Sequence, residues 1–431
     1  MKKNYQTTDH AAAIAVPDTI AVAMTYLAEE LREGLLALAV GTGLQVMDAI
    51  LEESVTALCG AKGRHDPERT AFRHGHEDGA VALGGRKVPV RRPRVRAADG
   101  SGELAIPAYE HFSSTEVLGQ MTMEKMLAKL STRRYKLGLE PVGTAVEARS
   151  SGKSRSAVSR RFVERTETAL AELLASNLSD LDLVAFMVDG VHFADHLCVV
   201  ALGIDVGGVK HPLAVVEGDT ENATVVKDLL VGLRDRGLDM TRPILVVIDG
   251  GKALHAAVNA VFDHPVIARC QLHKIRNVEA KLPKALAKTV ASKMRAIYHY
   301  DDALRAEAEL SELARQLQKS HPGAAGSLRE GLTETLTVMR LKIPPTLART
   351  LRSTNAVESM IEIARDHSTN VKRWRDGEMA LRWCAAGMGE ARKQFRKVNG
   401  FLHLPALRKT LDAYVTAGVT PADYNKEEDA A

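Results

Sequence analysis

The sequence predicts an α/β core that follows a mainly helical region and is interrupted by an all-α insertion. Three short apolar runs succeed one another between residues 183 and 218, and two further apolar runs then alternate with amphipathic helices. Such a series is typical of a mixed sheet with helices on both faces. From 283 to 352 the periodicity is helical throughout, which indicates the insertion.

The composition excludes several classes of protein. A chain of 431 residues is long enough for two or more domains, because single cores stop growing near about 250 to 300 residues. No apolar run is long enough to span a bilayer, and the first residues lack the apolar stretch of a signal peptide. We therefore expect a cytoplasmic protein without membrane contact. The cysteines lack a disulfide framework spacing, which suits a reducing compartment: Cys59, Cys198, Cys270 and Cys384.

Positive charge is clustered along the chain. The formal net charge of +4 is only mildly basic, so the clusters are more informative than the total. Because several such clusters recur in one cytoplasmic chain, we expect a polyanionic partner, most simply nucleic acid. The clusters span residues 86–96, 131–136, 153–162, 371–375 and 391–398.

The N-terminal part divides into two regions. Residues 1–60 have helical periodicity, and we expect two packed helices with Gly41 and Gly43 between them. In the region 61–113, the run "RKVPVRRPRVR" lies between glycine-rich turn signals and predicts a basic ribbon or hairpin. Pro89 and Pro93 would place such a strand at a sheet edge.

The region 114–180 is predicted to be helical and contains a pattern that resembles a helix-turn-helix. A polar break, "SSGKS", precedes a helix with an apolar stripe that includes Val158 and Phe162. A helix with serine and arginine on its other face could enter the major groove of DNA, although a bundle helix with a basic face would show the same pattern. The candidate DNA-binding residues on that face are Arg155, Ser156, Ser159 and Arg160.

Two of the predicted buried strands end in aspartate followed by glycine. Asp189 follows "LVAFMV" and Asp249 follows "ILVVI". Functional groups gather at the carboxyl ends of strands in open α/β sheets, and two such acids would attract a divalent metal. Each aspartate could instead cap a turn or serve as a phosphatase-type nucleophile.

A third acid lies on a later predicted helix. Ser353, Thr354 and Asn355 are good N-cap residues, and Glu358 follows them. Asn355, Glu358 and Arg365 share one face of that helix. An ordinary solvated face would present a similar set of side chains.

The region that carries these acids resembles the mutator-type (MULE-like) family of bacterial insertion-sequence transposases. The motifs include "MVDGVHF", "VVIDGGKAL", "RCQLHKIRNV", "LRSTNAVESM" and "RDHSTNVKRWRDGEMALRWCAAG". The resemblance implies an RNase H-like core with a DDE triad and a helical insertion before the glutamate. Asp249 lies 60 residues beyond Asp189, and Glu358 lies 109 residues beyond Asp249, which leaves room for that insertion. The implied regions are 181–282 and 353–400 for the core, 283–352 for the insertion and 401–431 for a tail.

The resemblance also assigns residues near the triad. Its Cys-x-x-His motif is present as Cys270 and His273, and its basic residue beyond the glutamate is Arg365. A stand-alone zinc site would need further ligands, so this pair is either a buried thiol beside an imidazole or part of the active site near DNA.

The chemistry implied is cleavage and transfer of DNA strands with two divalent ions. Asp189 would be shared by both ions, and Asp249 and Glu358 would each bind one. Mg²⁺ is expected because all ligands are oxygens, with Mn²⁺ as a substitute. Arg365, Lys372 and Arg373 would hold phosphates, and Trp374 would either stack on a base or pack in the core.

The expected partners are double-stranded DNA, as element ends and as target, and further copies of the chain in a homo-oligomer. The protein would then be associated with the nucleoid. Two alternatives remain open at this level: a catalytically silent DNA-binding regulator derived from a transposase, and a structure-selective nuclease on the same core.

Overall fold

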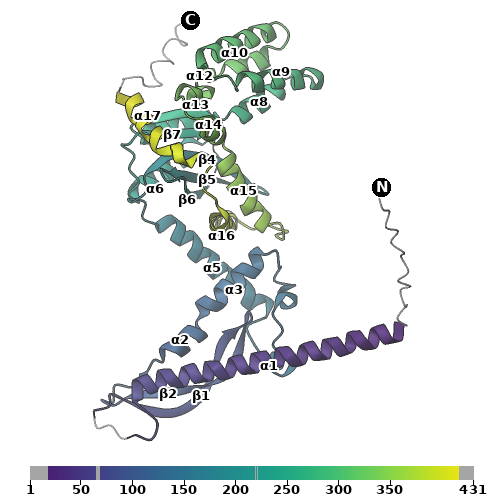
Figure 1. Ribbon diagram of the computed structural model, residues 1–431, viewed down its shortest axis with the longest axis vertical. Helices are drawn as coiled ribbons and strands as arrows, with labels where there is room; N and C mark the ends of the chain where they lie inside the picture. Colours follow the sequence, from purple (N-terminus) through teal and green to yellow (C-terminus); the bar gives the residue numbers. More distant parts are fainter. Residues whose placement is uncertain (1–17, 65–67, 219, 221, 417–431) are drawn as a thin grey trace, which may run out of the picture. The chain divides into compact units, whose positions relative to one another are not determined.

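The computed structural model describes residues 18–64, 68–218, 220 and 222–416, and the chain divides into two compact units (Figure 1). The first unit comprises Met1–Met126 and Thr132–Phe162, and the second comprises Leu127–Ser131 and Val163–Ala431. The finer division into seven regions stays a prediction. Among the described residues, no helix is long and apolar enough to cross a membrane.

The first unit is built on a long helix that packs against a small antiparallel sheet. Helix α1 (Asp18–Cys59) contacts both long strands of this sheet. The expectation of two packed helices is wrong for this region, because α1 runs through both glycines without a break. A Cβ added at Gly41 or Gly43 would meet nothing within 4 Å, and an isolated glycine costs a helix only about 1 kcal/mol relative to alanine. Within the expected tail, residues 401–416 are helical. Its remainder, 417–431, and residues 1–17 of the first region lie outside the described residues.

The predicted basic ribbon is a hairpin with a short third strand, in the order β1-β2-β3. Its strands are β1 (Ala71–Leu83), β2 (Arg86–Ala97) and β3 (Glu103–Leu104). The expectation that β2 lies at a sheet edge is wrong, because β2 is the middle strand. Its residues Val95 and Arg96 pair with β3. β3 does not extend as far as Pro89 and Pro93. Beside these prolines, β2 therefore forms no hydrogen bonds to β3 that would need their missing N–H groups.

Part of the ribbon's positive charge is neutralised within the sheet. Arg92 and Arg94 both form ion pairs with Glu77 and with Glu103. These arginines are therefore less available to a polyanion than the sequence alone indicates.

Short helices complete the first unit. They are α2 (Pro107–Ser113), α3 (Thr115–Leu127), the 3₁₀ turn η1 (Tyr135–Gly138) and α4 (Thr144–Arg149). The turn is fixed to the hairpin by Tyr135, which is fully buried and donates its hydroxyl proton to the Gly85 carbonyl at 3.1 Å. Helix α5 (Arg155–Ala175) begins in the first unit and continues into the second.

The second unit contains the predicted mixed sheet, with five strands in the order β6-β5-β4-β7-β8. β4 pairs antiparallel with β5 and parallel with β7, and β7 pairs parallel with β8. The sequence predicted that the first strand of this sheet ends at Asp189, and this prediction is wrong. β4 continues beyond it to Phe193, because its antiparallel ladder with β5 is longer than its parallel ladder with β7. The strands are β4 (Leu183–Phe193), β5 (His196–Asp205), β6 (Lys210–Glu217), β7 (Ile244–Ile248) and β8 (Pro265–Arg269).

Helices cover both faces of this sheet, as predicted. One core lies between the sheet and α6 (Ala223–Asp235) and α7 (Lys252–Val261). The other core lies under helices from the last third of the chain, and it takes Met187 from β4 and Val247 from β7. These helices are α14 (Pro345–Leu351), α15 (Asn355–His367), α16 (Gly377–Gln394) and α17 (Leu404–Thr416), with the 3₁₀ turn η2 (Phe401–His403) before α17.

The segment between β8 and α14 is helical throughout and has its own core. Its helices gather beyond β7 in Figure 1, and α12 and α13 contact the neighbouring strand β8. This arrangement is compatible with the predicted all-α insertion, and α8 packs in the same core although it precedes residue 283. The helices are α8 (Gln271–Glu279), α9 (Lys284–Ile297), α10 (Ala303–Gln318), α11 (Pro322–Arg329), α12 (Leu332–Thr335) and α13 (Thr337–Arg340).

A buried ion pair joins the insertion to the sheet. Arg269 at the end of β8 contacts Glu334 of α12 at 2.5 Å, and their side chains are only 10% and 11% exposed. His255 of α7 lies 3.1 Å from the same carboxylate. Burial opposes ionisation of Glu334, but hydrogen bonds from His255 and Arg269 outweigh it and lower the pKa of this carboxyl group.

We predict that Glu334→Ala lowers the free energy of unfolding of the second unit by about 3 kcal/mol, because it leaves the Arg269 cation buried without its main partner. Urea unfolding followed by tryptophan fluorescence measures this, since both tryptophans, Trp374 and Trp383, lie in the second unit. Glu312→Ala is the matched control. It breaks the exposed pair with Arg315 and should cost under about 1 kcal/mol; equal losses in both variants would contradict the assigned role of Glu334.

Candidate active site

Three polar residues form a row across the carboxyl ends of the parallel strands. The register pairs Met187 with Val247 and Val247 with Ala268, and two residues beyond these lie Asp189, Asp249 and Cys270. Side chains alternate between the faces of a sheet with a period of two. Asp189, within β4, therefore projects to the face that carries Met187, Val247 and Ala268, which is the face that α15 covers. Asp249 and Cys270 are the first residues after β7 and β8, at the same edge.

Each aspartate uses one oxygen for a local turn. Asp189 Oδ1 accepts a hydrogen bond from the Gly190 N–H at 2.8 Å, and Asp249 Oδ1 accepts one from the Gly251 N–H at 3.1 Å. The second oxygen of each has no hydrogen-bond partner among the described residues. One carboxylate can therefore fill both roles that the sequence left open. One oxygen caps the turn, and the other oxygen can bind a metal ion.

The glycine after Asp249 is required by the backbone. Gly250 has a φ of +105°, and a Cβ there would lie 2.9 Å from a guanidinium nitrogen of Arg269. Few L residues adopt this conformation. The run "IDGG" therefore lets the chain turn sharply between a buried strand and α7.

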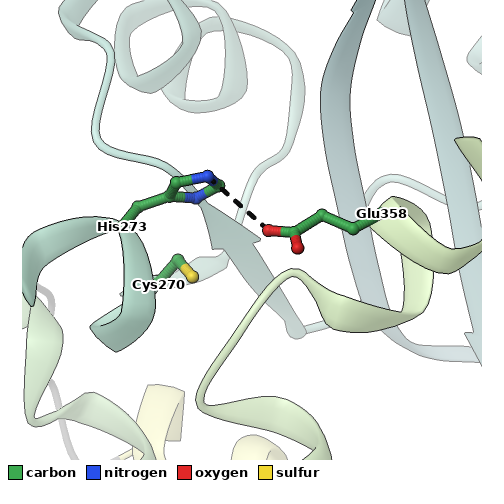
Figure 2. Close-up of side chains that lie close together, drawn as sticks. All are labelled: Cys270, His273 and Glu358. Carbon is green, nitrogen blue, oxygen red and sulfur yellow. Dashed lines mark ion pairs between the residues drawn. The ribbon is translucent and has the colours of Figure 1, made fainter. Parts of the chain in front are cut away.

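Glu358 reaches the same region from the first turn of α15. Its Oε1 accepts a hydrogen bond from the Thr354 hydroxyl at 2.9 Å and lies 3.6 Å from His273 Nε2 (Figure 2). Thr354 was predicted as a capping residue, but its side chain caps no backbone amide. Its hydroxyl instead contacts Cys270 Sγ and His273 Nδ1, each at 3.4 Å.

Thr354 thus joins three elements at one buried point. Its side chain is fully buried, and its backbone N–H also donates to Cys270 Sγ at 3.4 Å. Cys270 lies between β8 and α8, His273 lies in α8, and Glu358 lies in α15. Sequence reasoning missed this role, although the spacing of four residues between Thr354 and Glu358 on one helix was a usable signal.

The electrostatics show that the acids share one environment. Burial, with smaller contributions from the Asp249 and Glu358 carboxylates, raises the pKa of Asp189 to about 6, although the Gly190 hydrogen bond and His273 oppose the rise. The hydrogen bond to Cys270 and the nearby Glu358 and Asp189 carboxylates raise the pKa of His273 to about 8, although burial opposes this. Two additional negative groups around one buried carboxylate favour a cation at this place.

The tightest group differs from the predicted triad. Among the described residues, the potential ligand atoms of Cys270, His273 and Glu358 all lie within 4.8 Å of one another, whereas the three acids do not form so close a group. Burial opposes ionisation of the Cys270 thiol, but hydrogen bonds from His273 and Thr354 outweigh it and lower the pKa of Cys270. The Cys-x-x-His pair is therefore part of the surroundings of Glu358.

The remaining predicted residues differ in exposure. Trp374 is half-buried, and its ring lies 4.9 Å from Phe193 and 6.2 Å from Trp383 between centroids, so its contacts are those of the packing alternative. On α5, Val158 and Phe162 are buried. The other candidates are exposed: Arg155, Ser156, Ser159, Arg160, Asn355, Arg365, Lys372 and Arg373.

Comparison with known proteins decides the family. A family profile described as "Transposase, Mutator family" matches residues 28–398. The chain belongs to the Mutator family of transposases. The match spans both units and the insertion, so the second unit and its acids belong to the part of the chain that defines the family.

Similarity to individual transposases also covers more than half of the chain. The chain is 29% identical to the transposase for insertion sequence element ISRM5 of Rhizobium meliloti over 371 residues, which are 84% of this chain and 90% of that protein. It is 30% identical to the transposase for insertion sequence element IS6120 of Mycolicibacterium smegmatis, over 59% of this chain and 79% of that protein. It is 23% identical to the transposase for IS256 in transposon Tn4001 of Staphylococcus aureus, over 73% and 80%.

We predict that Thr354→Val lowers the free energy of unfolding of the second unit by about 2 kcal/mol, since the buried thiol and carboxylate lose their shared hydroxyl partner. Thr354→Ser keeps the hydroxyl and should cost about 1 kcal/mol for the lost methyl group. Tryptophan fluorescence during urea unfolding measures both. A valine variant as stable as the wild type would contradict the role of the hydroxyl.

Proposed function

We propose that this transposase binds the terminal inverted repeats of its insertion sequence and cuts and joins DNA strands with Asp189, Asp249 and Glu358 as metal ligands. The observation that carries the proposal is the row of Asp189 and Asp249 at one edge of the sheet, to which α15 brings Glu358. We take the core to be RNase H-like, and the strand order and the all-α insertion between the second and third acids support this.

The donors suit a hard divalent cation. All three proposed ligands are carboxylates, which favours Mg²⁺, with Mn²⁺ as a substitute. The raised pKa of Asp189 supports a cation there, because a positive ion would relieve the repulsion among the carboxylates. When bound, two such ions supply an activated nucleophile and neutralise the leaving oxygen.

The chain's own residues would set the geometry. Asp189 is central and would bind both ions, Asp249 would bind one, and Glu358 would bind the other. Thr354 holds Glu358 Oε1 at 2.9 Å and so fixes its orientation. The exposed Arg365, Lys372 and Arg373 would contact phosphates at the edge of the site.

Recognition of the DNA ends is assigned to the first unit and the start of α5. Val158 and Phe162 are buried while Arg155, Ser156, Ser159 and Arg160 remain exposed, which leaves a polar face for the major groove. Pairing two element ends with a target would require a homo-oligomer. The site of action would be the nucleoid in the cytoplasm.

We predict that Asp249→Asn abolishes cleavage and strand transfer on DNA that carries the element's own ends, by about 10³-fold or more. A metal ligand stabilises transition-state charge by several kcal/mol, and each 1.4 kcal/mol is about tenfold in rate. Gel assays with Mg²⁺ measure both reactions. Asp228→Asn is the matched control, because Asp228 is exposed on α6, and it should keep full activity.

The same assay separates the alternatives. Cleavage without joining, or cleavage of any branched DNA, would favour the structure-selective nuclease. Binding of the ends by the wild type without either reaction would favour the silent regulator.

We predict that Arg160→Ala weakens binding of the element ends and lowers the salt dependence of binding by about one counterion, because a phosphate or base contact is lost. Anisotropy titrations over a range of salt concentrations measure this. Lys227→Ala removes an exposed charge of α6 and should leave binding unchanged. An Arg160→Ala variant with the wild-type slope and affinity would exclude α5 as the recognition helix.

A further inference from the structure

A cavity of about 400 Å³ lies where the insertion meets the core. Its walls come from the segment after α9, from α13 and from α14 with the residue that ends it. Tyr298, Tyr300, Met339 and Ile343 supply apolar surface to the lining. The size lies within the range of about 300 to 1,000 Å³ that is usual for ligand pockets, and it exceeds what a lone small anion needs.

The cavity is positively charged. Lys342, Arg349 and Arg352 line it, and Asp301 is the one carboxylate that does so among the described residues. Within the described part of the chain, none of the three cations has a side-chain hydrogen bond or an ion pair. Most arginines of the second unit that are as buried as Arg352 contact an acid or a carbonyl, so this cavity differs from the rest of the unit.

The positive charge of Arg352 is held in an unfavourable environment. The residue is half-buried, and burial together with the nearby Arg349 cation lowers the pKa of its guanidinium group. Two neighbouring like charges without a carboxylate partner repel each other, and an anion bound between them would relieve this repulsion. The pocket therefore favours an anionic ligand.

The pocket adjoins the candidate active site through the backbone. The Gln271 N–H donates to the Arg352 carbonyl at 3.0 Å. Gln271 directly follows Cys270, and Arg352 lies two residues before Thr354. A ligand held by Arg352 would thus lie beside the segment that positions Glu358.

We propose that this pocket binds a backbone phosphate of the DNA strand that enters the active site, with the adjoining nucleotide against its apolar wall. The inference rests on the proposed function, since that function brings DNA to this part of the molecule. Arg349 and Arg352 hold the phosphate, and Lys342 adds to the local positive potential. The contact is to the backbone, so it is independent of base sequence.

The test measures binding without catalysis. Full-length Asp249→Asn protein in EDTA is titrated with fluorescent single-stranded and double-stranded oligonucleotides of arbitrary sequence at several salt concentrations. The pocket variant adds Arg349→Gln and Arg352→Gln. The matched control adds Lys288→Gln and Lys319→Gln, which remove two exposed charges from the same insertion. Arg349→Gln alone, at an exposed position, replaces the double variant if that variant does not fold.

We expect the pocket variant to lower the slope of log affinity against log salt by about one to two relative to its parent, with little change in the control. Equal slopes in the pocket variant and the control would overturn the proposal.

Calorimetry with inorganic phosphate tests whether the pocket binds a free phosphate ion and not a phosphate of DNA. Phosphate binding that the variant loses while the DNA slope stays unchanged would assign the pocket to a small anion and overturn the DNA contact. Because no cleavage is measured, these results do not depend on the proposed catalysis.

Discussion

The candidate site depends on the partial burial of the Asp189 carboxylate beside two others, Asp249 and Glu358, that the fold of the second unit brings close to it. Parallel register places Asp189 and Asp249 at one edge of the sheet, and α15 adds Glu358. Burial and these neighbours raise the pKa of Asp189 to about 6. The fold opposes the repulsion with His273 from within the chain, and the proposed divalent ions would complete the balance. The fold thus concentrates negative charge at the place where we propose that DNA is cut.

The insertion contributes to this site as well as lengthening the chain. Arg269 and Glu334 fix its base to the end of β8, and Cys270 and His273 begin it beside the row of acids. Thr354 then joins that base to α15 through the contacts with Cys270, His273 and Glu358. A displacement of the insertion would therefore alter the orientation of Glu358.

Much of the second unit could be predicted from the sequence, because strands buried on both faces are continuous apolar runs and insertion helices are amphipathic. The same reasoning failed where contacts between residues distant in sequence determine the local structure or the role of a side chain. The long α1 passes through Gly41 and Gly43 because nothing there forces a turn. The hairpin of the first unit was predicted from its basic strand alone, because the glycines and histidines of β1 hide the period of two. Thr354 was recognised only as a cap, since two of its hydroxyl partners, Cys270 and His273, lie some 80 residues away in sequence.

The central claim is that three distant acids bind one pair of divalent cations. The most direct measurement is the number of Mn²⁺ ions bound per chain, counted by electron paramagnetic resonance with uncleavable DNA present. The account predicts two ions for the wild type, one fewer for Asp249→Asn and for Glu358→Gln, and none held tightly by Asp189→Asn. An unchanged ion count in all three variants would contradict it.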